Sequence, residues 1–283
     1  DFLRVPSAGH YPLKHIIKHM GKHLFYDRKV LEKTLFQILT SHRSFTAEMV
    51  EQVQELQIPW LDINLGCPSN TVCKNHGGSY LLHDVPKLAP LIKKIRSLFK
   101  GRLSCKIRLG YKDSSEFENI IKMLNDEGVD IIIVHARTRE DLYQRPAQWS
   151  FIEKAVHISR VPIIGNGDIW NVEDIDQMFS VTGCHGVMIA RGALRAPWMV
   201  RDYIYKSSHK VPQIHEIKKF LNTYLHFMKE HQFSQRGLLK RSKSITRFMF
   251  DQLENGHKIR RHFMLSETVD EFYTKLNELE NMD

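Results

Sequence analysis

Asn64 and Cys67 are the residues of this 283-residue chain that most directly suggest chemistry. They lie in the segment Trp60-Leu-Asp-Ile-Asn-Leu-Gly-Cys-Pro-Ser69, which reads as a short buried strand that stops abruptly. Gly66 and Pro68 direct the backbone out of that strand, because glycine permits unusual dihedral angles and proline has no amide hydrogen for a ladder. A polar side chain and a thiol at the carboxyl end of a buried strand suit a catalytic site on an α/β scaffold. An isolated cysteine is more often structural, so the assignment depends on the surrounding motifs.

The elements that must position these residues form a repeating pattern. Between Lys33 and Ala190 the chain alternates between short apolar segments and amphipathic helical patterns. The predicted strands are Leu35–Leu39, Trp60–Leu65, Leu103–Leu109, Ile131–His135, Pro162–Asn166 and Gly186–Ala190. The predicted helices between them are Thr46–Gln57, Val85–Phe99, Glu116–Glu127 and Val172–Phe179. Strands that are apolar on both faces, each separated from the next by one helix, predict parallel βα units.

Six such units fit either a doubly wound sheet or most of a (β/α)8 barrel. The barrel is favoured because the last two strands end in glycine-containing turns, Gly165–Asp168 and Arg191-Gly192, where barrels usually hold a phosphate. A Rossmann sheet would show G-x-G-x-x-G after an early strand, and the sequence has no such motif. Asp1–Val5 supplies a seventh strand. We therefore predict an α/β TIM barrel whose first strand is missing.

The chain after the barrel pattern is expected to be helical. Residues 1–205 form the predicted barrel domain and residues 211–283 a small all-helical domain. Its predicted helices are Ile214–His231, Gly237–Leu253 and Glu267–Leu279. Between Arg236 and Arg261 there are eight basic residues and two acidic ones, with Phe248, Phe250, His257 and His262 interleaved. This favours nucleic-acid contact over a solvated helix face, in line with a net charge of +9.

The cysteines and the apolar segments indicate the cellular compartment in which the protein is expected. The four cysteines are scattered without a C-x-x-C pair, which indicates reduced thiols in a cytoplasmic protein. No compact Cys/His cluster has the spacing of zinc ligands, so no metal site is expected. No window approaches the run of about 18 apolar residues that a membrane span needs, and no leader pattern is visible. We expect a monomer with no membrane partner.

Six motifs occur together in a fixed order. They are Asp62–Ser69, Asn75–Leu82, Cys105–Gly110, Val134–Glu140, Ile163–Asp168 and Gly186–Ala193. In this order and spacing they resemble the tRNA-dihydrouridine synthases, flavoenzymes with an FMN-binding barrel and a helical C-terminal domain. The turn Asp168-Ile-Trp170 and the Ser-Tyr-Leu-Leu sequence are most similar to the bacterial branch that acts on the tRNA D-loop near position 16.

The resemblance implies a reaction and a role for Cys67. Reduced FMN, recharged by NADPH, would deliver hydride to C6 of a uridine base in tRNA, and a general acid would protonate C5. Cys67 matches the family's catalytic cysteine, and a free thiol with a pKa near 8.5 is mostly protonated at neutral pH. Asn64 would orient the base or the flavin edge, although a strand-end hydrogen bond to the backbone explains this residue equally well.

The resemblance also implies the cofactor-binding and RNA-binding residues. Lys106 would stabilise negative charge on the N1/O2 side of the reduced flavin, while Gln37 and His135 would contact the ring. The phosphate end would be held by Asn166, Gly167, Asp168, Ala190 and Arg191. The resemblance assigns Arg137 and Arg139, after His135, to the RNA, and the basic stretch itself adds Arg241 and Arg247.

Some positions depart from the family pattern. The Ala-Pro-Met strand that usually opens the barrel has no counterpart, Ala136 stands where glycine is usual, and Tyr80 replaces a small residue. Two alternatives therefore stay open. One is a non-catalytic RNA-binding relative that has lost FMN. The other is an FMN barrel oxidoreductase with a small-molecule substrate, which the basic C-terminal region disfavours.

Overall fold

The structure is a computed structural model that describes residues 2–206, 214–231 and 233–281. Contacts divide the chain into two compact units. The first comprises Asp1–Asp168 and Ile175–Met188, and the second comprises Ile169–Asp174 and Ile189–Asp283. The domain boundary expected between residues 205 and 211 stays a prediction, because residues 207–213 lie outside the described residues.

The first unit is built on one seven-stranded sheet in which every neighbouring pair of strands is parallel. The strands are β1 (Leu3–Arg4), β2 (Phe36–Leu39), β3 (Trp60–Leu65), β4 (Arg102–Arg108), β5 (Ile131–His135), β6 (Ile163–Asn166) and β7 (Gly186–Met188). They pair strictly in chain order, which is the order of a (β/α)8 barrel, whereas a doubly wound sheet reverses direction at a switch point. The predicted barrel fold with one strand fewer is confirmed.

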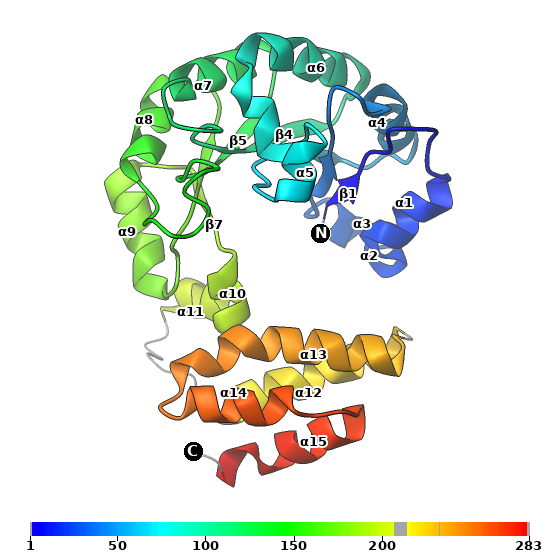
Figure 1. Cartoon of the computed structure of the whole chain (residues 1–283), viewed down its shortest axis with the longest axis vertical. Coiled ribbons are helices and arrows are strands. Elements are labelled where there is room, and N and C mark those ends of the chain that lie inside the picture. Colours follow the sequence, from blue (N-terminus) through cyan, green and yellow to red (C-terminus); the bar gives the residue numbers. More distant parts are fainter. Residues whose placement is uncertain (1, 207–213, 232, 282–283) are drawn as a thin grey trace. The chain divides into compact units, whose positions relative to one another are not determined.

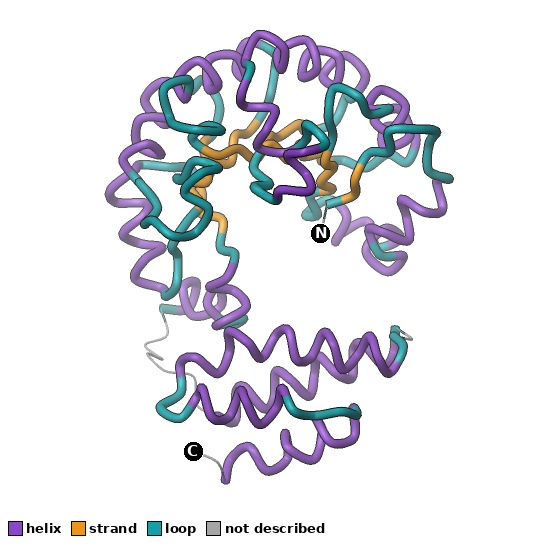
Figure 2. Tube along the Cα trace, viewed as in Figure 1, coloured by secondary structure: helices purple, strands orange, loops and turns teal. Residues whose placement is uncertain are grey.

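Helices follow the strands, and most of the longer ones line the convex side of the curved sheet (Figures 1 and 2). Between β1 and β4 they are α1 (Leu13–Met20), α2 (Lys22–Tyr26), α3 (Arg28–Leu31), α4 (Thr46–Glu55), α5 (Asn70–Lys74), the 3-10 helix η1 (Gly78–His83) and α6 (Val85–Leu98). The later ones are α7 (Phe117–Asp126), α8 (Ser150–Ile158) and α9 (Val172–Thr182). The sequence pattern did not predict α1 to α3 or α8, which contain between 4 and 9 residues each.

The two faces of the sheet differ in polarity. Side chains alternate along a strand, so Leu61, Ile63 and Leu65 of β3 share the face that the helices cover, and Asp62 and Asn64 share the concave face. The same alternation in β4 places a serine, a lysine and an arginine on the concave face. The prediction that the strands are apolar on both faces is therefore wrong for β3 and β4. Buried polar groups are tolerated there because they have hydrogen-bonding partners.

The second unit is helical. Its elements are α10 (Arg191–Arg195), α11 (Met199–Tyr205), α12 (Ile214–Glu230), α13 (Gln235–Met249), the 3-10 helix η2 (Phe250–Gln252), α14 (Gly256–Met264), α15 (Val269–Glu278) and the 3-10 helix η3 (Leu279–Asn281). An apolar core joins α12 to α15, with the rings of Phe250 and Phe263, and of Phe263 and Phe272, each 5.0 Å apart. The helical C-terminal region is confirmed.

The helix expected over Gly237–Leu253 ends early, and α14 follows it. Gly256 begins α14 with its Cα so near the preceding turn that a Cβ would lie 1.8 Å from the carbonyl oxygen of Phe250. Only glycine fits this approach, which explains why Asn255-Gly256 separates two helices. Within the described residues, no helix is both long and apolar enough to cross a membrane.

Candidate active site

The polar side chains of the concave face come together through strand register. Gln37 of β2 pairs with Asp62 of β3, which pairs with Ser104 of β4. One step towards the carboxyl ends, Asn64 pairs with Lys106. Partners in adjacent parallel strands point to the same face, so these five side chains form two neighbouring rows. Residues that are far apart in the sequence thus share one surface at the carboxyl ends of the strands.

A chain of hydrogen bonds links these rows to the turn that carries the cysteine. The carboxyl group of Asp62, which has no exposed surface, accepts from the Ser104 hydroxyl at 2.5 Å and from Gln37 Nε2 at 2.7 Å. Gln37 Oε1 accepts from Asn64 Nδ2 at 2.9 Å. Asn64 Oδ1 accepts from the backbone N–H groups of Cys67 at 2.9 Å and Gly66 at 3.1 Å. We call this chain the Asp62 relay.

The N–H groups at the turn set the direction of each hydrogen bond from the turn to Asp62 Oδ2. A backbone N–H can only donate, so Asn64 must present its carbonyl oxygen to Cys67 and its NH2 group to Gln37. Gln37 then presents its own NH2 group to Asp62, whose Oδ2 must accept. A proton on the Asp62 carboxyl therefore has its place on Oδ1, facing Ser104, where it leaves the relay intact.

The Cys67 turn is held from its other side as well. The Cys67 carbonyl oxygen accepts from the Ser79 hydroxyl at 2.8 Å and from the Ser79 N–H at 3.2 Å. Gly78, with φ of +60°, lets η1 approach so closely that a Cβ there would lie 2.9 Å from the Cys67 Cβ. Cys67 itself is partly exposed, whereas the other three cysteines, Cys73, Cys105 and Cys184, are buried. The turn thus presents one accessible thiol from a fixed backbone.

Burial shifts the pKa of two groups on this face. It raises the pKa of Asp62 to about 7, against the opposing hydrogen bonds from Ser104 and Gln37 and the weaker attraction of Lys106. It lowers the pKa of Lys106 to about 8, and repulsion from Arg108 adds to that effect. The Lys106 ammonium makes no hydrogen bond or ion pair with any other described residue, although the side chain is only half exposed. This cation is available to an anionic group on the concave face.

Two buried arginines, one in β4 and one in the loop after β5, hold the loops at the carboxyl ends of the strands. Arg108 is 1% exposed and donates to the carbonyl oxygens of Gly66 at 2.9 Å and Thr138 at 2.7 Å. Arg137 is 3% exposed and binds both carboxylate oxygens of Asp168, at 2.7 and 2.6 Å. Both of these bonds come from Nη2, while Nη1 lies 3.2 Å from Nε2 of His135 and Nε donates to the Arg145 carbonyl oxygen at 2.5 Å. The structure therefore places Arg137, which was assigned to RNA, among internal partners.

The residues expected at the phosphate divide between the two units. In the first, Asn166 Nδ2 donates to the Met188 carbonyl oxygen at 2.8 Å, and Gly167 has a φ of +125° that a larger residue would strain. Asp168 is tied to Arg137 and to the N–H of Ala147 at 2.7 Å. The remaining two, which belong to the second unit, are Ala190 and Arg191, and the guanidinium of Arg191 lies 4.6 Å from the ring centre of Trp170.

The other residues assigned to RNA have exposed or half-exposed charges. Arg139 lies over the Tyr111 ring at 5.4 Å and donates to Asn70 Oδ1 at 2.6 Å. Arg241 and Arg247 are exposed on α13. Phe250, which was expected to interleave with the basic stretch at the surface, is instead fully buried in the helical core, so that part of the prediction is wrong. No cluster of metal-ligating side chains occurs among the residues that the structure describes.

Comparison with known proteins decides the family. The family model described as dihydrouridine synthase matches residues 14–282. The chain belongs to the dihydrouridine synthase family. It is 30% identical over 228 residues to a probable tRNA-dihydrouridine synthase of Aquifex aeolicus, covering 80% of this chain and 71% of that protein. It is 36% identical over 214 residues to a probable tRNA-dihydrouridine synthase of Helicobacter pylori, covering 72% and 64%.

The name of a third relative includes the number of a tRNA position. The tRNA-dihydrouridine(16) synthase of Pseudomonas syringae pv. tomato is 33% identical over 193 residues, covering 66% of this chain and 61% of that protein. The chain thus spans between 61% and 71% of the length of the three relatives that it matches here.

Two site residues of this dihydrouridine synthase family member were not predicted from the sequence. Asp62 and Ser104 were taken as parts of apolar strands, yet they are the inner end of the Asp62 relay. The signal that could have found them was their spacing: each lies two residues before a recognised site residue, Asn64 or Lys106, and so on the same face of its strand.

The raised pKa of Asp62 predicts a pH-dependent stability. The folded-state pKa of about 7 lies above the ordinary value of 3.8, so folding binds a proton between these values. The stabilisation is complete below the ordinary value and is lost as the pH rises through about 7. Asp62→Asn cannot titrate, and its amide preserves the relay because Ser104 can accept from it. From about pH 5 to about pH 8, the unfolding free energy of the wild type should fall by about 2 to 3 kcal/mol relative to the variant.

Urea denaturation across this pH range measures the difference. Asp176→Asn, at an exposed carboxylate of α9, is the control and should follow the wild-type curve. Parallel curves for the wild type and Asp62→Asn would show that Asp62 is not held with a raised pKa.

The relay also predicts a compensating pair of substitutions. Gln37→Glu places two acceptors face to face at Asp62 Oδ2, which should loosen the Cys67 turn at about pH 8. Adding Asp62→Asn restores a donor opposite Glu at position 37, because the new amide donates there and still accepts from Ser104. Iodoacetamide should alkylate Cys67 roughly 3- to 10-fold faster in Gln37→Glu than in the wild type, because the loss of one hydrogen bond costs about 1 kcal/mol. In the double variant the alkylation rate should return towards the wild-type rate.

Cys67→Ser identifies the signal, since the other cysteines are buried. A double variant that reacts as fast as Gln37→Glu would contradict the relay.

Proposed function

We propose that this chain reduces uridines of tRNA to 5,6-dihydrouridine, with FMN as its cofactor and NADPH as the reductant. The observation that carries the proposal is the Asp62 relay, which holds the N–H of Cys67 through Asn64. Asn64 is in register with Lys106, whose ammonium has no hydrogen bond or ion pair with the described residues. The match to the dihydrouridine synthase family over residues 14–282 supports it. The proposal takes its substrate from the names of the relatives, which are tRNA-dihydrouridine synthases.

The residues of the concave face fit a flavin. FMN has an electron-rich pyrimidine edge, and a half-buried ammonium with no partner among the described residues, that of Lys106, is suited to it. Gln37 is also half-buried, and after the relay has used one hydrogen of its NH2 group the other stays available to a ring oxygen or nitrogen. His135 follows in the next row. We assign the ring to these three side chains.

The phosphate assignment rests on the resemblance. It gives that end of the cofactor to Asn166, Gly167, Asp168, Ala190 and Arg191. In the first unit, the left-handed backbone at Gly167 and the internal ties of Asn166 and Asp168 keep this turn rigid. A rigid turn with exposed N–H groups is a common way of binding phosphate. FMN in this site would supply the hydride that reaches C6 of the uracil.

Cys67 would supply the proton. Its partly exposed thiol stands on a turn whose N–H is fixed by Asn64 and whose carbonyl is fixed by Ser79. Fixing both groups limits where Sγ can lie, which favours proton transfer to one carbon of a bound base. Because the Asn64 side-chain oxygen already accepts hydrogen bonds from the N–H groups of Gly66 and Cys67, the part of Asn64 in the reaction is to orient the acid. Only the second hydrogen of its NH2 group is left for a ligand.

Binding of the tRNA is assigned to the cations on the surface. We assign RNA phosphates to Arg241 and Arg247, which are exposed on α13, and to Arg139, whose guanidinium lies over Tyr111 and also pairs with Glu140. The tRNA-dihydrouridine(16) synthase of Pseudomonas syringae supports a target in the D-loop near position 16. Arg137, bound to Asp168, would support the loop from within. We further propose a cytoplasmic monomer.

The acid assignment predicts the behaviour of Cys67→Ala. The variant should keep its flavin, because the ring contacts lie elsewhere, and dihydrouridine formation should fall by about 10²- to 10⁴-fold, the usual effect of removing a general acid. The visible absorption spectrum reports the flavin, and mass spectrometry of tRNA nucleosides reports the product. Cys184→Ala, at a buried cysteine outside the Asp62 relay, is the control. Unchanged turnover in Cys67→Ala would rule out the thiol as the acid, and a purified wild type that takes up no FMN would favour a non-catalytic relative.

The basic stretch predicts the effect of charge reversal. Arg241→Glu and Arg247→Glu should each weaken tRNA binding by on the order of tenfold at low salt and leave the flavin spectrum unchanged. Lys219→Glu, at an exposed lysine of α12, is the matched control. Filter binding at several salt concentrations measures the affinities. If the two arginine variants bind tRNA as the lysine variant does, this face of α13 is only solvated.

A further inference from the structure

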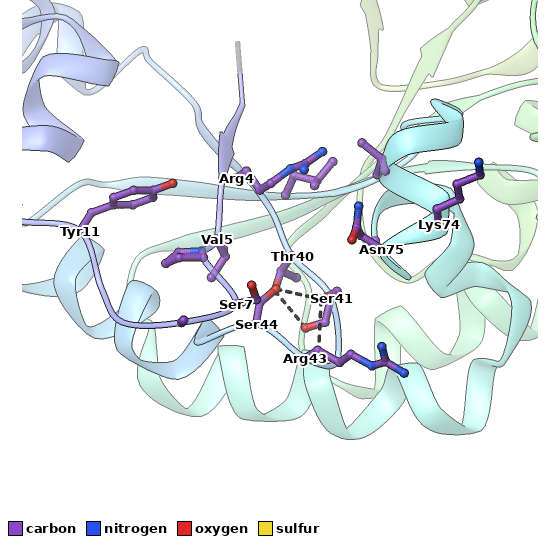
Figure 3. A pocket seen from close by; sticks show the side chains of 15 residues that line it. Arg4, Val5, Ser7, Tyr11, Thr40, Ser41, Arg43, Ser44, Lys74 and Asn75 are labelled. Atoms are coloured by element: carbon purple, nitrogen blue, oxygen red, sulfur yellow. Dashed lines mark hydrogen bonds between the residues drawn. The ribbon is translucent and has the colours of Figure 1, made fainter.

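A cationic pocket lies beside the helix that follows the Cys67 turn. It has a volume of about 480 Å³ and is lined by the ends of β1 and β2 and by the end of α5 (Figure 3). Three of its lining residues are basic, Arg4, Arg43 and Lys74, and none is acidic. The part of the chain that the structure describes offers none of these three side chains a hydrogen bond or an ion pair. The pocket therefore gathers three uncompensated positive charges.

The floor of this pocket is polar and internally satisfied. Ser41 Oγ lies 2.8 Å from Ser44 Oγ and accepts from the backbone N–H of Arg43 at 3.3 Å (Figure 3). The Thr40 hydroxyl is hydrogen-bonded to that of Thr46, which lies behind the lining residues. Thr40 is 1% exposed and Ser41 is 8% exposed. Guanidinium and ammonium groups around such a floor match the oxygens of a phosphate group, whereas an apolar ligand would leave the charges unpaired.

A second pocket, of about 290 Å³, adjoins the first through Lys74, which lines both. Its walls are aromatic and cationic. The rings of His76 and His83 both stack on Tyr80, at 4.6 and 5.9 Å, and Tyr80 meets the edge of Tyr111 at 5.5 Å. The guanidinium of Arg139 lies over Tyr111 at 5.4 Å and pairs with Glu140 at 2.7 Å. No acidic residue lines it either. Rings beside cations, in a cleft of this size, suit a planar heterocycle that stacks.

We propose that the two pockets form one subsite for a nucleotide that flanks the target base in single-stranded RNA. The phosphodiester occupies the cationic pocket, and the unpaired base occupies the aromatic pocket, where it extends the stack that His76 forms on Tyr80. Proteins that bind unpaired RNA combine these two features, a basic groove for the backbone and aromatic side chains for the bases. The α5 helix between the pockets begins three residues after Cys67, so a strand crossing it reaches the Cys67 turn. This inference rests on the proposed function.

The base contact is tested with a uridine hexanucleotide labelled with fluorescein, in fluorescence anisotropy titrations of the FMN-loaded protein. Tyr80→Ala should weaken binding by about 5- to 150-fold, which is the value of one stacked base. Tyr80→Phe keeps the ring and should bind within about twofold of wild type. Equal affinity in Tyr80→Ala and wild type, with matching circular dichroism spectra, would overturn the base assignment.

The phosphate contact is tested through the salt dependence. In Arg43→Ser/Lys74→Ser the slope of log affinity against log salt should fall by about 0.7 for each phosphate that no longer meets a cation. Lys93→Ser/Lys94→Ser removes the same charge from exposed positions of α6 and should leave the slope unchanged. An equal decrease of the slope in both double variants would mean that only overall charge matters, and would overturn the pocket assignment.

A free nucleotide could bring the same phosphate chemistry, and competition separates the two sources. If an RNA strand is the ligand, UMP and inorganic phosphate should displace the hexanucleotide only at concentrations on the order of a hundredfold higher than unlabelled hexanucleotide. Displacement by UMP at equal concentration would assign the pockets to a free nucleotide and overturn the strand proposal.

The outcome also separates this inference from the proposed function. Wild-type protein that forms dihydrouridine, while both pocket variants bind the hexanucleotide normally, refutes the subsite alone. If the wild-type protein forms no dihydrouridine, but its hexanucleotide binding depends on Tyr80, Arg43 and Lys74, the proposed reaction is refuted and the proposed subsite is supported.

Discussion

The rest of the site depends on one buried carboxyl group. Asp62 has no exposed surface, and such a group is stable only if its oxygens are hydrogen-bonded. Its two donors, Gln37 and Ser104, come from the strands on either side, so the group joins β2, β3 and β4 on their concave face. Because each amide in the relay has a donor end and an acceptor end, satisfying Asp62 also sets which atom of Asn64 meets the Cys67 turn.

The same requirement explains how the sheet divides its two faces. The helix-covered face can be apolar throughout, since its neighbours are apolar side chains. The concave face carries groups that must find partners, and parallel register supplies them by bringing residues of like position side by side. Arg108 extends this arrangement to the loops, where it donates to carbonyl oxygens of two different βα turns. Because the polar side chains of the concave face find hydrogen-bonding partners in neighbouring strands and loops, they also hold the loops at the carboxyl ends of the strands rigid.

This division also marks what the sequence could predict. The bounds of β3 and β5 were predicted to the residue, because an apolar segment with sharp ends is a local signal. The helices α1 to α3, α8 and α14 were missed, since short helices held by tertiary contacts have weak periodicity. Asn64 and Cys67 stood out at a strand end, but their support did not. Asp62 finds its donors 25 and 42 positions away, and only strand register brings such residues together.

The role of each charged residue is likewise not predictable from the sequence alone. A net charge of +9 indicates a polyanionic partner but does not say which cations meet it. Arg108 and Arg137 are buried and satisfied by carbonyl and carboxylate oxygens, so they bring rigidity and little affinity. Among the residues that the structure describes, Arg4 and Arg43 have no such partners, and they face a pocket that no acidic residue lines. A cation that the fold leaves uncompensated keeps its attraction for a ligand, so the absence of an internal partner, more than the number of basic residues, identifies the surface that RNA would meet.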